Sequence, residues 1–313
     1  MKKALLVMGN LLLPPEMEEL ENHFDVIRLW KERDPEGVLQ ERRNDIVAIA
    51  SFHYVPVSKT LIESLPNLEI IAQFATGTDN IDLAAAAARG IPVTNTPDVL
   101  TDDTADTGMA LLLACARRVC EGDMYVRIGK WHNGPMPLGV TLKGKKAGIV
   151  GMGKIGQAVA KRCQAFGMDI YYHGPRPKDV PYHYSEDIHA LAAVSDFLIL
   201  CCPGGPATAG MVDGPVLESL GERGILINIA RGSVVDEPAL VDALEKRRIL
   251  AAGLDVFAHE PNVPETLISM DNVVILPHIG GGPVEARAEM GQLVIANIQA
   301  HFKGEPLLSP VAA

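Results

Sequence analysis

The sequence predicts an α/β fold made of two domains that each contain a parallel sheet. Short apolar runs alternate with helix-like segments along the whole chain, which is the pattern of βαβ units. The chain has 313 residues, enough for two domains of about 150 residues each. A glycine-rich turn at 151–156 separates a short apolar run from a helical segment, as at the start of a nucleotide-binding fold.

The first series of elements occupies residues 1–98. Helices are expected near 15–23, 57–66 and 81–90, and Gly90 has the place of a residue that ends a helix in the left-handed conformation. The expected strands are LLVMG (5–9), DIVAIAS (45–51), LEIIAQFAT (68–76) and IPVTN (91–95). Together these segments make a complete small α/β domain.

A long helix is expected from Thr101 onward, through GMALLLACARRVCEGDMYVRIGKW. Thr101 suits the N-cap position, and Asp102 and Asp103 favour the positive end of the helix dipole. The helix is apolar over much of its circumference, which predicts burial either within the molecule or against a second subunit.

The second series begins near 143 and ends with an amphipathic helix at 283–303. Its alternation of strands and helices disfavours all-α and all-β folds. The expected strands lie at 147–151, 168–173, 196–202, 224–230, 249–257 and 273–277.

Composition excludes several classes of protein. There are 28 basic and 39 acidic residues and a formal charge of −11, which argues against nucleic-acid and anionic-membrane partners. No apolar run reaches the ~18 residues of a membrane span, and Gly9 and Asn10 interrupt the apolar N-terminal run, which favours a first strand over a signal peptide. The five cysteines form no CxxC pair, so we expect reduced thiols in a cytoplasmic protein.

The turn Gly151-Met152-Gly153-Lys154-Ile155-Gly156 predicts a dinucleotide site, because it follows a strand and opens a helix. Gly151 permits the tight turn, Gly153 lets the backbone approach a pyrophosphate, and Gly156 allows close packing of helix and strand. The helix N-terminus then offers N–H groups to the anion. The alternative is a structural turn without a ligand.

The next strand predicts which dinucleotide binds. An NAD site usually has Asp or Glu at the end of this strand, where it binds the ribose 2′-hydroxyl. Here His173 has that place and Arg176 follows three residues later. A guanidinium can bind a 2′-phosphate with two hydrogen bonds, whereas a carboxylate would repel it. We therefore expect NADP(H), unless Arg176 and Lys178 are ordinary solvated charges.

Three further segments each follow an expected strand, at 227–237, 253–261 and 276–282. Ligands bind outside the carboxyl ends of the strands in open α/β sheets, so all three segments are predicted to face one crevice. They supply Arg231, Asp255, Glu260 and His278.

The ordered motifs resemble the D-isomer-specific 2-hydroxyacid dehydrogenase family over essentially the whole chain, with ATGTDNID (75–82), VLTDDTAD (99–106) and CCPGGPAT (201–208) matching as well. The chain is most similar to the family's NADPH-preferring glyoxylate/hydroxypyruvate reductases. The resemblance implies a flavodoxin-like substrate-binding domain (1–98 and 287–313), a doubly wound dinucleotide-binding domain (99–286), and an active-site cleft between these two Rossmann-like domains. It also implies a homodimer formed through the 101–130 region.

The resemblance implies that His278 donates a proton to the keto oxygen and that Glu260 pairs with it and sets its tautomer. Arg231 would bind the substrate carboxylate and polarise the carbonyl, while the backbone N–H groups of Thr76 and Gly77 bind the carboxylate's other side. Asp255 would contact the nicotinamide carboxamide. No metal is expected. The remaining cofactor contacts would come from Thr104, Lys154, Ile155, Pro203, Thr208, Ile229, Ala230 and Gly280.

Some alternatives stay open at this point. Another family activity, on 2-ketogluconate, D-lactate or 3-phosphoglycerate, is possible, although 1–98 has no evident Arg/Lys cluster for a phosphorylated substrate. A dinucleotide-sensing protein without catalysis is disfavoured by the intact set of Arg231, Glu260 and His278. The roles of His53 and Trp131 and the choice of keto acid are not decided by the sequence.

Overall fold

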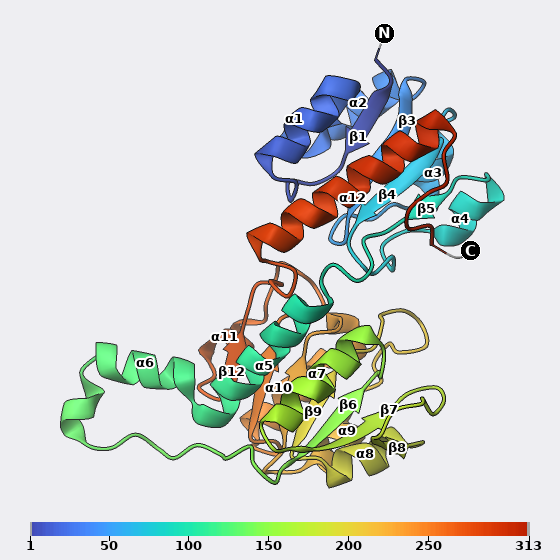
Figure 1. Ribbon diagram of the computed structural model, residues 1–313. Helices are drawn as coiled ribbons and strands as arrows, with labels where there is room; N and C mark the ends of the chain where they lie inside the picture. The colour runs from blue at the N-terminus through green and yellow to red at the C-terminus, as the bar shows by residue number, and fades with distance from the viewer. Residues whose placement is uncertain (1, 312–313) are drawn as a thin grey trace. The chain divides into compact units, whose positions relative to one another are not determined.

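The computed structural model describes residues 2–311, which divide into two compact units (Figure 1). The first unit contains the described residues up to Leu100 and those from Gly282 onward, and the second unit is Thr101–Gly281. These borders differ by a few residues from the borders predicted at 98/99 and 286/287. The first unit is discontinuous because the C-terminal helix α12 (Val284–Lys303) packs against its sheet and its first helix.

The first unit is built on a five-stranded parallel sheet with the order β2-β1-β3-β4-β5. This order is that of flavodoxin-like folds, as predicted. The strands are β1 (Ala4–Val7), β2 (Asp25–Arg28), β3 (Ile46–Phe52), β4 (Ile70–Phe74) and β5 (Val93–Thr94). Leu5, Ile49, Ile71 and Ile298 are fully buried in one apolar core between this sheet and its helices.

The helices of the first unit lie on its sheet, and α1 and α12 pack against each other (Figure 1). Besides α12 they are α1 (Pro14–His23), the 3₁₀ helix η1 (Leu29–Lys31), α2 (Pro35–Arg42), α3 (Lys59–Ser64) and α4 (Leu83–Ala88). Gly90 has a φ of 66° two residues after α4, which confirms its predicted helix-ending role. The sequence did not predict α2, which buries no residue and therefore has no apolar stripe.

The second unit has a seven-stranded parallel sheet with the order β12-β11-β10-β9-β6-β7-β8. The strand order reverses between β6 and β9, as in a doubly wound dinucleotide-binding fold, so the predicted fold class is confirmed. The strands are β6 (Lys146–Val150), β7 (Asp169–His173), β8 (His183–Ser185), β9 (Phe197–Leu200), β10 (Ile225–Asn228), β11 (Ala251–Leu254) and β12 (Val273–Ile275).

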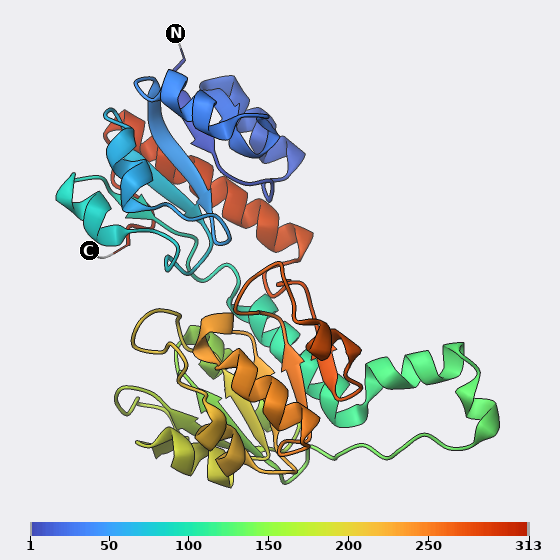
Figure 2. The ribbon, with the colours of Figure 1, turned by 180° about the vertical axis from the view of Figure 1, so that it is seen from behind.

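The helix that opens the second unit differs from the prediction in two ways. Thr101 is already the first helical residue of α5 (Thr101–Arg117), so the expectation that it caps the helix is wrong. The helix is also interrupted, because Arg118 adopts a left-handed backbone with φ 54° and a new helix, α6 (Val119–Arg127), starts after it. Figures 1 and 2 show α6 and the chain that follows it projecting from the second unit as an arm.

The other helices of the second unit pack against its sheet or connect its strands, except η2, which lies on the arm. They are η2 (Lys130–Asn133), α7 (Lys154–Ala165), α8 (Ile188–Val194), α9 (Gly214–Leu220), η3 (Gly232–Val234), α10 (Glu237–Glu245) and α11 (Glu265–Ser269). Among the described residues, no helix combines the length and the hydropathy needed to cross a bilayer.

Candidate active site

The glycine-rich turn joins β6 to α7 in the geometry that a pyrophosphate requires. Gly151 has a φ of 95°, its N–H donates to the carbonyl of His173, and a Cβ there would lie 2.7 Å from the backbone of Cys202. A Cβ on Gly153 would meet no atom within 4 Å, so there is open space above the N-terminus of α7. Unpaired N–H groups at a helix start attract an anion into such a space. The turn therefore fits a bound dinucleotide.

The end of β7 and the loop after it carry the two residues predicted to bind the ribose of the dinucleotide, His173 and Arg176. His173 is half-buried, and its Nδ1 lies 3.0 Å from the carbonyl oxygen of Ser185 on β8. Because a carbonyl can only accept, Nδ1 must be the protonated ring nitrogen. Arg176 is exposed in the loop after β7, and no acidic residue occurs in 171–178. No carboxylate therefore stands beside Arg176 in this stretch to repel a 2′-phosphate, and the first acidic residue of the loop is Asp179.

The loop after β9 contains the predicted cofactor residues Pro203 and Thr208. The hydroxyl of Thr208 donates to the carbonyl of Pro203 at 2.7 Å. The backbone N–H of Thr208 donates to the carbonyl of Gly205. These bonds hold the loop in a defined turn next to the glycine-rich segment, whose Gly151 contacts Cys202.

Asn228, at the end of β10, shapes the turn that presents Arg231. Its side-chain oxygen accepts from the N–H of Ala230 and its amide nitrogen donates to the carbonyl of Arg231, both at 3.0 Å. Arg231 is half-buried and donates from Nη1 to the carbonyl of Ala230 at 2.8 Å. Gly232 then contacts the next loop so closely that a Cβ would lie 1.9 Å from the carbonyl carbon of Phe257.

Glu260 and His278 form a close hydrogen-bonded pair in the loops after β11 and β12. Nδ1 of His278 lies 2.7 Å from Oε2 of Glu260, and Oε1 of Glu260 accepts from the N–H of Phe257 at 3.0 Å. Both side chains are about three-quarters buried. The carboxylate fixes the imidazole through Nδ1, so proton transfer to a ligand would come from Nε2. The structure thus brings together the pair that the sequence predicted.

Asp255 anchors the backbone that follows His278. Its carboxylate is almost fully buried and accepts from the N–H groups of Ile279 and Gly280 at 2.7 and 2.8 Å. Burial raises the pKa of Asp255, and these two hydrogen bonds partly oppose that rise. Thr104 on α5 completes the contact with a long 3.4 Å hydrogen bond to the carbonyl of Gly280. The expected contact of Asp255 with a nicotinamide carboxamide stays a prediction.

Thr76 and Gly77 follow β4 and belong to the first unit, whereas Arg231, Glu260 and His278 belong to the second. The hydroxyl of Thr76 donates to the carbonyl of Thr96 at 3.1 Å. The fully buried Gln73 donates from Nε2 to the carbonyl of Gly77 and to Oδ1 of Asn80. The loop that carries the predicted carboxylate-binding amides is therefore held in shape by the buried side chain of Gln73 and by the Thr76 hydroxyl.

Two residues with undecided roles lie in different units. His53 is half-buried after β3, with its ring 5.2 Å from that of Tyr54. Trp131 lies in η2 on the arm and is 68% exposed. The sequence did not single out Gln73, Asn80 and Asn228, and the signal in each case is an amide side chain within or just beyond an apolar strand.

The comparisons with known proteins agree with this geometry. Residues 109–280, more than half of the chain, match the family model described as the NAD-binding domain of D-isomer-specific 2-hydroxyacid dehydrogenases. The chain belongs to the D-isomer-specific 2-hydroxyacid dehydrogenase family. The resemblance noted in the sequence is thereby confirmed, and the site of this dehydrogenase can be interpreted with the chemistry of its family.

Several relatives resemble the dehydrogenase over nearly its whole length. It is 47% identical to glyoxylate/hydroxypyruvate reductase A of Arabidopsis thaliana, with 94% of each chain covered. It is 45% identical to 2-ketogluconate reductase of Gluconobacter oxydans, over 82% of this chain and 83% of that one. Among solved structures, it is similar to the NADPH-dependent glyoxylate/hydroxypyruvate reductase of Sinorhizobium meliloti in complex with NADP and malonate. The TM-score is 0.93 and the identity 41%, and the match covers 100% of this chain and 97% of that one.

Proposed function

We propose that this dehydrogenase reduces glyoxylate, hydroxypyruvate and similar small 2-keto acids to D-2-hydroxy acids with NADPH. The observation that carries the proposal is the His278–Glu260 pair, with 2.7 Å between Nδ1 and Oε2. A carboxylate-held imidazole is suited to protonate the oxygen of a carbonyl as it is reduced. The names of the Arabidopsis and Sinorhizobium relatives support this substrate class.

The chain's own residues divide the work of binding and proton transfer. Arg231 binds the substrate carboxylate and polarises the keto oxygen, with the amides of Thr76 and Gly77 on the carboxylate's other side. His278 gives its Nε2 proton to that oxygen, and Glu260 compensates the charge of the imidazolium. The bound dinucleotide supplies the hydride from C4 of its nicotinamide ring.

NADPH is the proposed cofactor because of the loop after β7. Arg176 offers a guanidinium for the 2′-phosphate, and His173 has the place where an NAD site has an acid. The complex of the Sinorhizobium relative with NADP supports the same choice.

A spectrophotometric assay at 340 nm tests the proposed function. NADPH and NADH are each mixed with glyoxylate, hydroxypyruvate, pyruvate, 2-ketogluconate and phosphohydroxypyruvate. We expect the fastest turnover with NADPH and one of the first two acids. Absence of turnover with every acid would refute the reductase proposal, and faster turnover with NADH would refute the cofactor assignment.

We also propose that the dehydrogenase is a homodimer formed through α5 and the arm, within and just beyond the 101–130 region. The arm exposes large apolar side chains that a single chain does not cover: Val119, Met124, Val126, Ile128, Trp131 and Leu138. Leu138 is 94% exposed, so Leu138→Asp removes apolar contact area at little cost to the isolated fold. Light scattering after gel filtration should give a dimer mass for the wild type and a lower mass for the variant. A monomeric wild type would contradict the proposal.

A cytoplasmic location is proposed from the cysteines. Among the described residues all five are free thiols, and reduced thiols are typical of that compartment. Denatured protein purified without reductant should titrate five thiols, and an intramolecular disulfide would contradict the proposal.

A further inference from the structure

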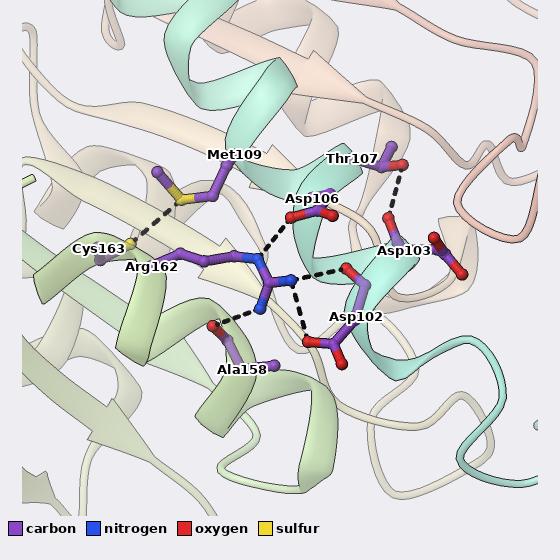
Figure 3. A network of polar contacts seen from close by, with 8 residues as sticks. All are labelled: Asp102, Asp103, Asp106, Thr107, Met109, Ala158, Arg162 and Cys163. Atoms are coloured by element: carbon purple, nitrogen blue, oxygen red, sulfur yellow. Dashed lines mark hydrogen bonds and ion pairs between the residues drawn. The ribbon is translucent and has the colours of Figure 1, made fainter. Parts of the chain in front are cut away.

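Arg162 joins the helix that follows the glycine-rich turn to the helix that opens the second unit. Its side chain extends from α7 to the first turns of α5 (Figure 3). Nε donates to Oδ1 of Asp106 at 2.6 Å, and Nη2 donates to Oδ1 of Asp102 at 3.0 Å and to the Asp102 carbonyl at 3.3 Å. Nη1 donates to the carbonyl of Ala158 on its own helix at 3.2 Å. All three guanidinium nitrogens are therefore engaged.

The carboxylates of Asp102 and Asp106 are one helical turn apart on α5. The guanidinium therefore binds one face of α5 at two successive turns. A planar guanidinium that is hydrogen-bonded at two points restricts both the rotation and the sliding of α5 against α7. A lysine ammonium, which acts as a point charge, would not restrict them in this way. The side chains of Asp102 and Asp106 are 81% and 67% exposed. Because solvent screens such pairs, their contribution to stability is small. The arrangement is better suited to setting geometry.

The opposite face of α5 contacts the loops that carry the proposed catalytic residues. Thr104 bonds to the carbonyl of Gly280, which lies two residues after His278. A Cβ on Gly108 would lie 2.8 Å from Cδ1 of Ile229, two residues before Arg231. At 100° per residue, Thr104 and Gly108 lie about 200° around the helix from Asp102 and Asp106. A rotation of α5 would therefore shift its contacts with both loops.

We propose that Arg162 is a positioning residue for the reduction, because it sets the rotation of α5 and thereby the placement of the loops that carry Arg231 and His278. This inference rests on the proposed function. The two helices also meet in the buried core, where the Sγ of Cys163 donates to the Sδ of Met109 at 3.6 Å (Figure 3). These contacts hold α5 and α7 together without the guanidinium, so a variant at Arg162 should fold.

The test compares Arg162→Met with a matched variant in the first unit, Arg42→Met. Arg42 also binds two carboxylates through Nε and Nη2, those of Asp45 and Asp25, each at 2.7 Å. We expect Arg162→Met to lower kcat about tenfold, because small displacements of reacting groups are costly. The Kd for NADPH should change less than threefold, since the Gly151 N–H of the phosphate turn is held by the carbonyl of His173 on β7. Arg162→Lys should recover part of the loss, and Arg42→Met should leave kcat within twofold of wild type.

Hydrogen exchange gives a readout that does not depend on turnover. The amides of Ile279 and Gly280, which donate to Asp255, should exchange faster in Arg162→Met than in wild type or Arg42→Met. If Arg162→Met has the kcat of Arg42→Met, or if exchange at these two amides is unchanged, the inference is overturned. If the wild type reduces no 2-keto acid, the proposed function fails instead, and the exchange measurement still decides whether Arg162 orders the loop after His278.

Discussion

Replacing Gly232 with alanine would add a methyl group where the backbone of the neighbouring loop already lies. The new Cβ would be 1.9 Å from the carbonyl carbon and 2.0 Å from the oxygen of Phe257. Ordinary van der Waals contact begins at 3.4 Å, so the two loops would have to separate by about 1.5 Å. One loop carries Arg231. In the other loop the N–H of Phe257 donates to the carboxylate of Glu260.

The separation should affect catalysis far more than folding. Overpacking of this kind costs about 1–3 kcal/mol of stability, because the backbone can shift within the loops. A misplacement of about 1 Å in an active site can reduce the rate by a factor of about 100. We therefore expect Gly232→Ala to lower kcat/KM for glyoxylate about 100-fold while the protein remains folded.

The assay measures kcat/KM, the Kd for NADPH by fluorescence, and urea unfolding. Gly214→Ala is the control, because its new Cβ would meet only the Ala239 Cβ at 4.0 Å, far from the proposed catalytic residues in sequence. The control should keep wild-type kinetics. If Gly232→Ala has a kcat/KM within twofold of wild type, the claim that contact between these loops places Arg231 and Glu260 is refuted.

Three further substitutions or modifications test the cofactor loop, the Arg231 turn and the buried thiols. Arg176→Ala should raise the Kd for NADPH at least tenfold and leave that for NADH within twofold, as measured by fluorescence titration; equal effects on both would contradict the 2′-phosphate assignment. Asn228→Ala should cost about 1–3 kcal/mol in urea unfolding and lower kcat/KM, because two hydrogen bonds of the Arg231 turn are lost; a neutral result would show that the turn forms without it. Burial raises the pKa of Cys202 to about 11 and of Cys163 to about 12, so at pH 8 the reactive thiolate is at least about 100-fold rarer than at the ordinary pKa of 9.0. Iodoacetamide labelling of both should be correspondingly slow in the native protein and rise with pH, and labelling as fast as in unfolded chain would contradict the stated burial.

The sequence predicted the central strands because they are buried on both faces and appear as unbroken apolar runs. Ile225–Asn228 and Phe197–Leu200 are examples. Short edge strands such as β2 and β8 have no such run, because one edge and part of their surface face solvent. The break at Arg118 was also missed, since nothing about an arginine indicates a left-handed backbone.

The proposed catalytic residues were named from the sequence because their types and motifs match a known family. The residues that hold these catalytic side chains in place were not named from the sequence. Asn228 and Gln73 act through hydrogen bonds to backbone groups that become neighbours only after folding. The same holds for Gly232. A side chain is excluded at this position because the backbone of Phe257, 25 residues later in the sequence, lies against it. An amide within an apolar strand indicates that Gln73 and Asn228 have buried partners, but which groups they contact follows only from the three-dimensional arrangement.

In the proposed mechanism His278, held by Glu260, donates the proton in the reduction of a 2-keto acid. The most direct test is the turnover of glyoxylate by His278→Gln with saturating NADPH, together with its Kd for NADPH. We expect kcat to fall by about 100-fold or more while the Kd stays within about threefold of wild type. Turnover by His278→Gln at a rate close to that of wild type would contradict this mechanism and would assign the proton to another group.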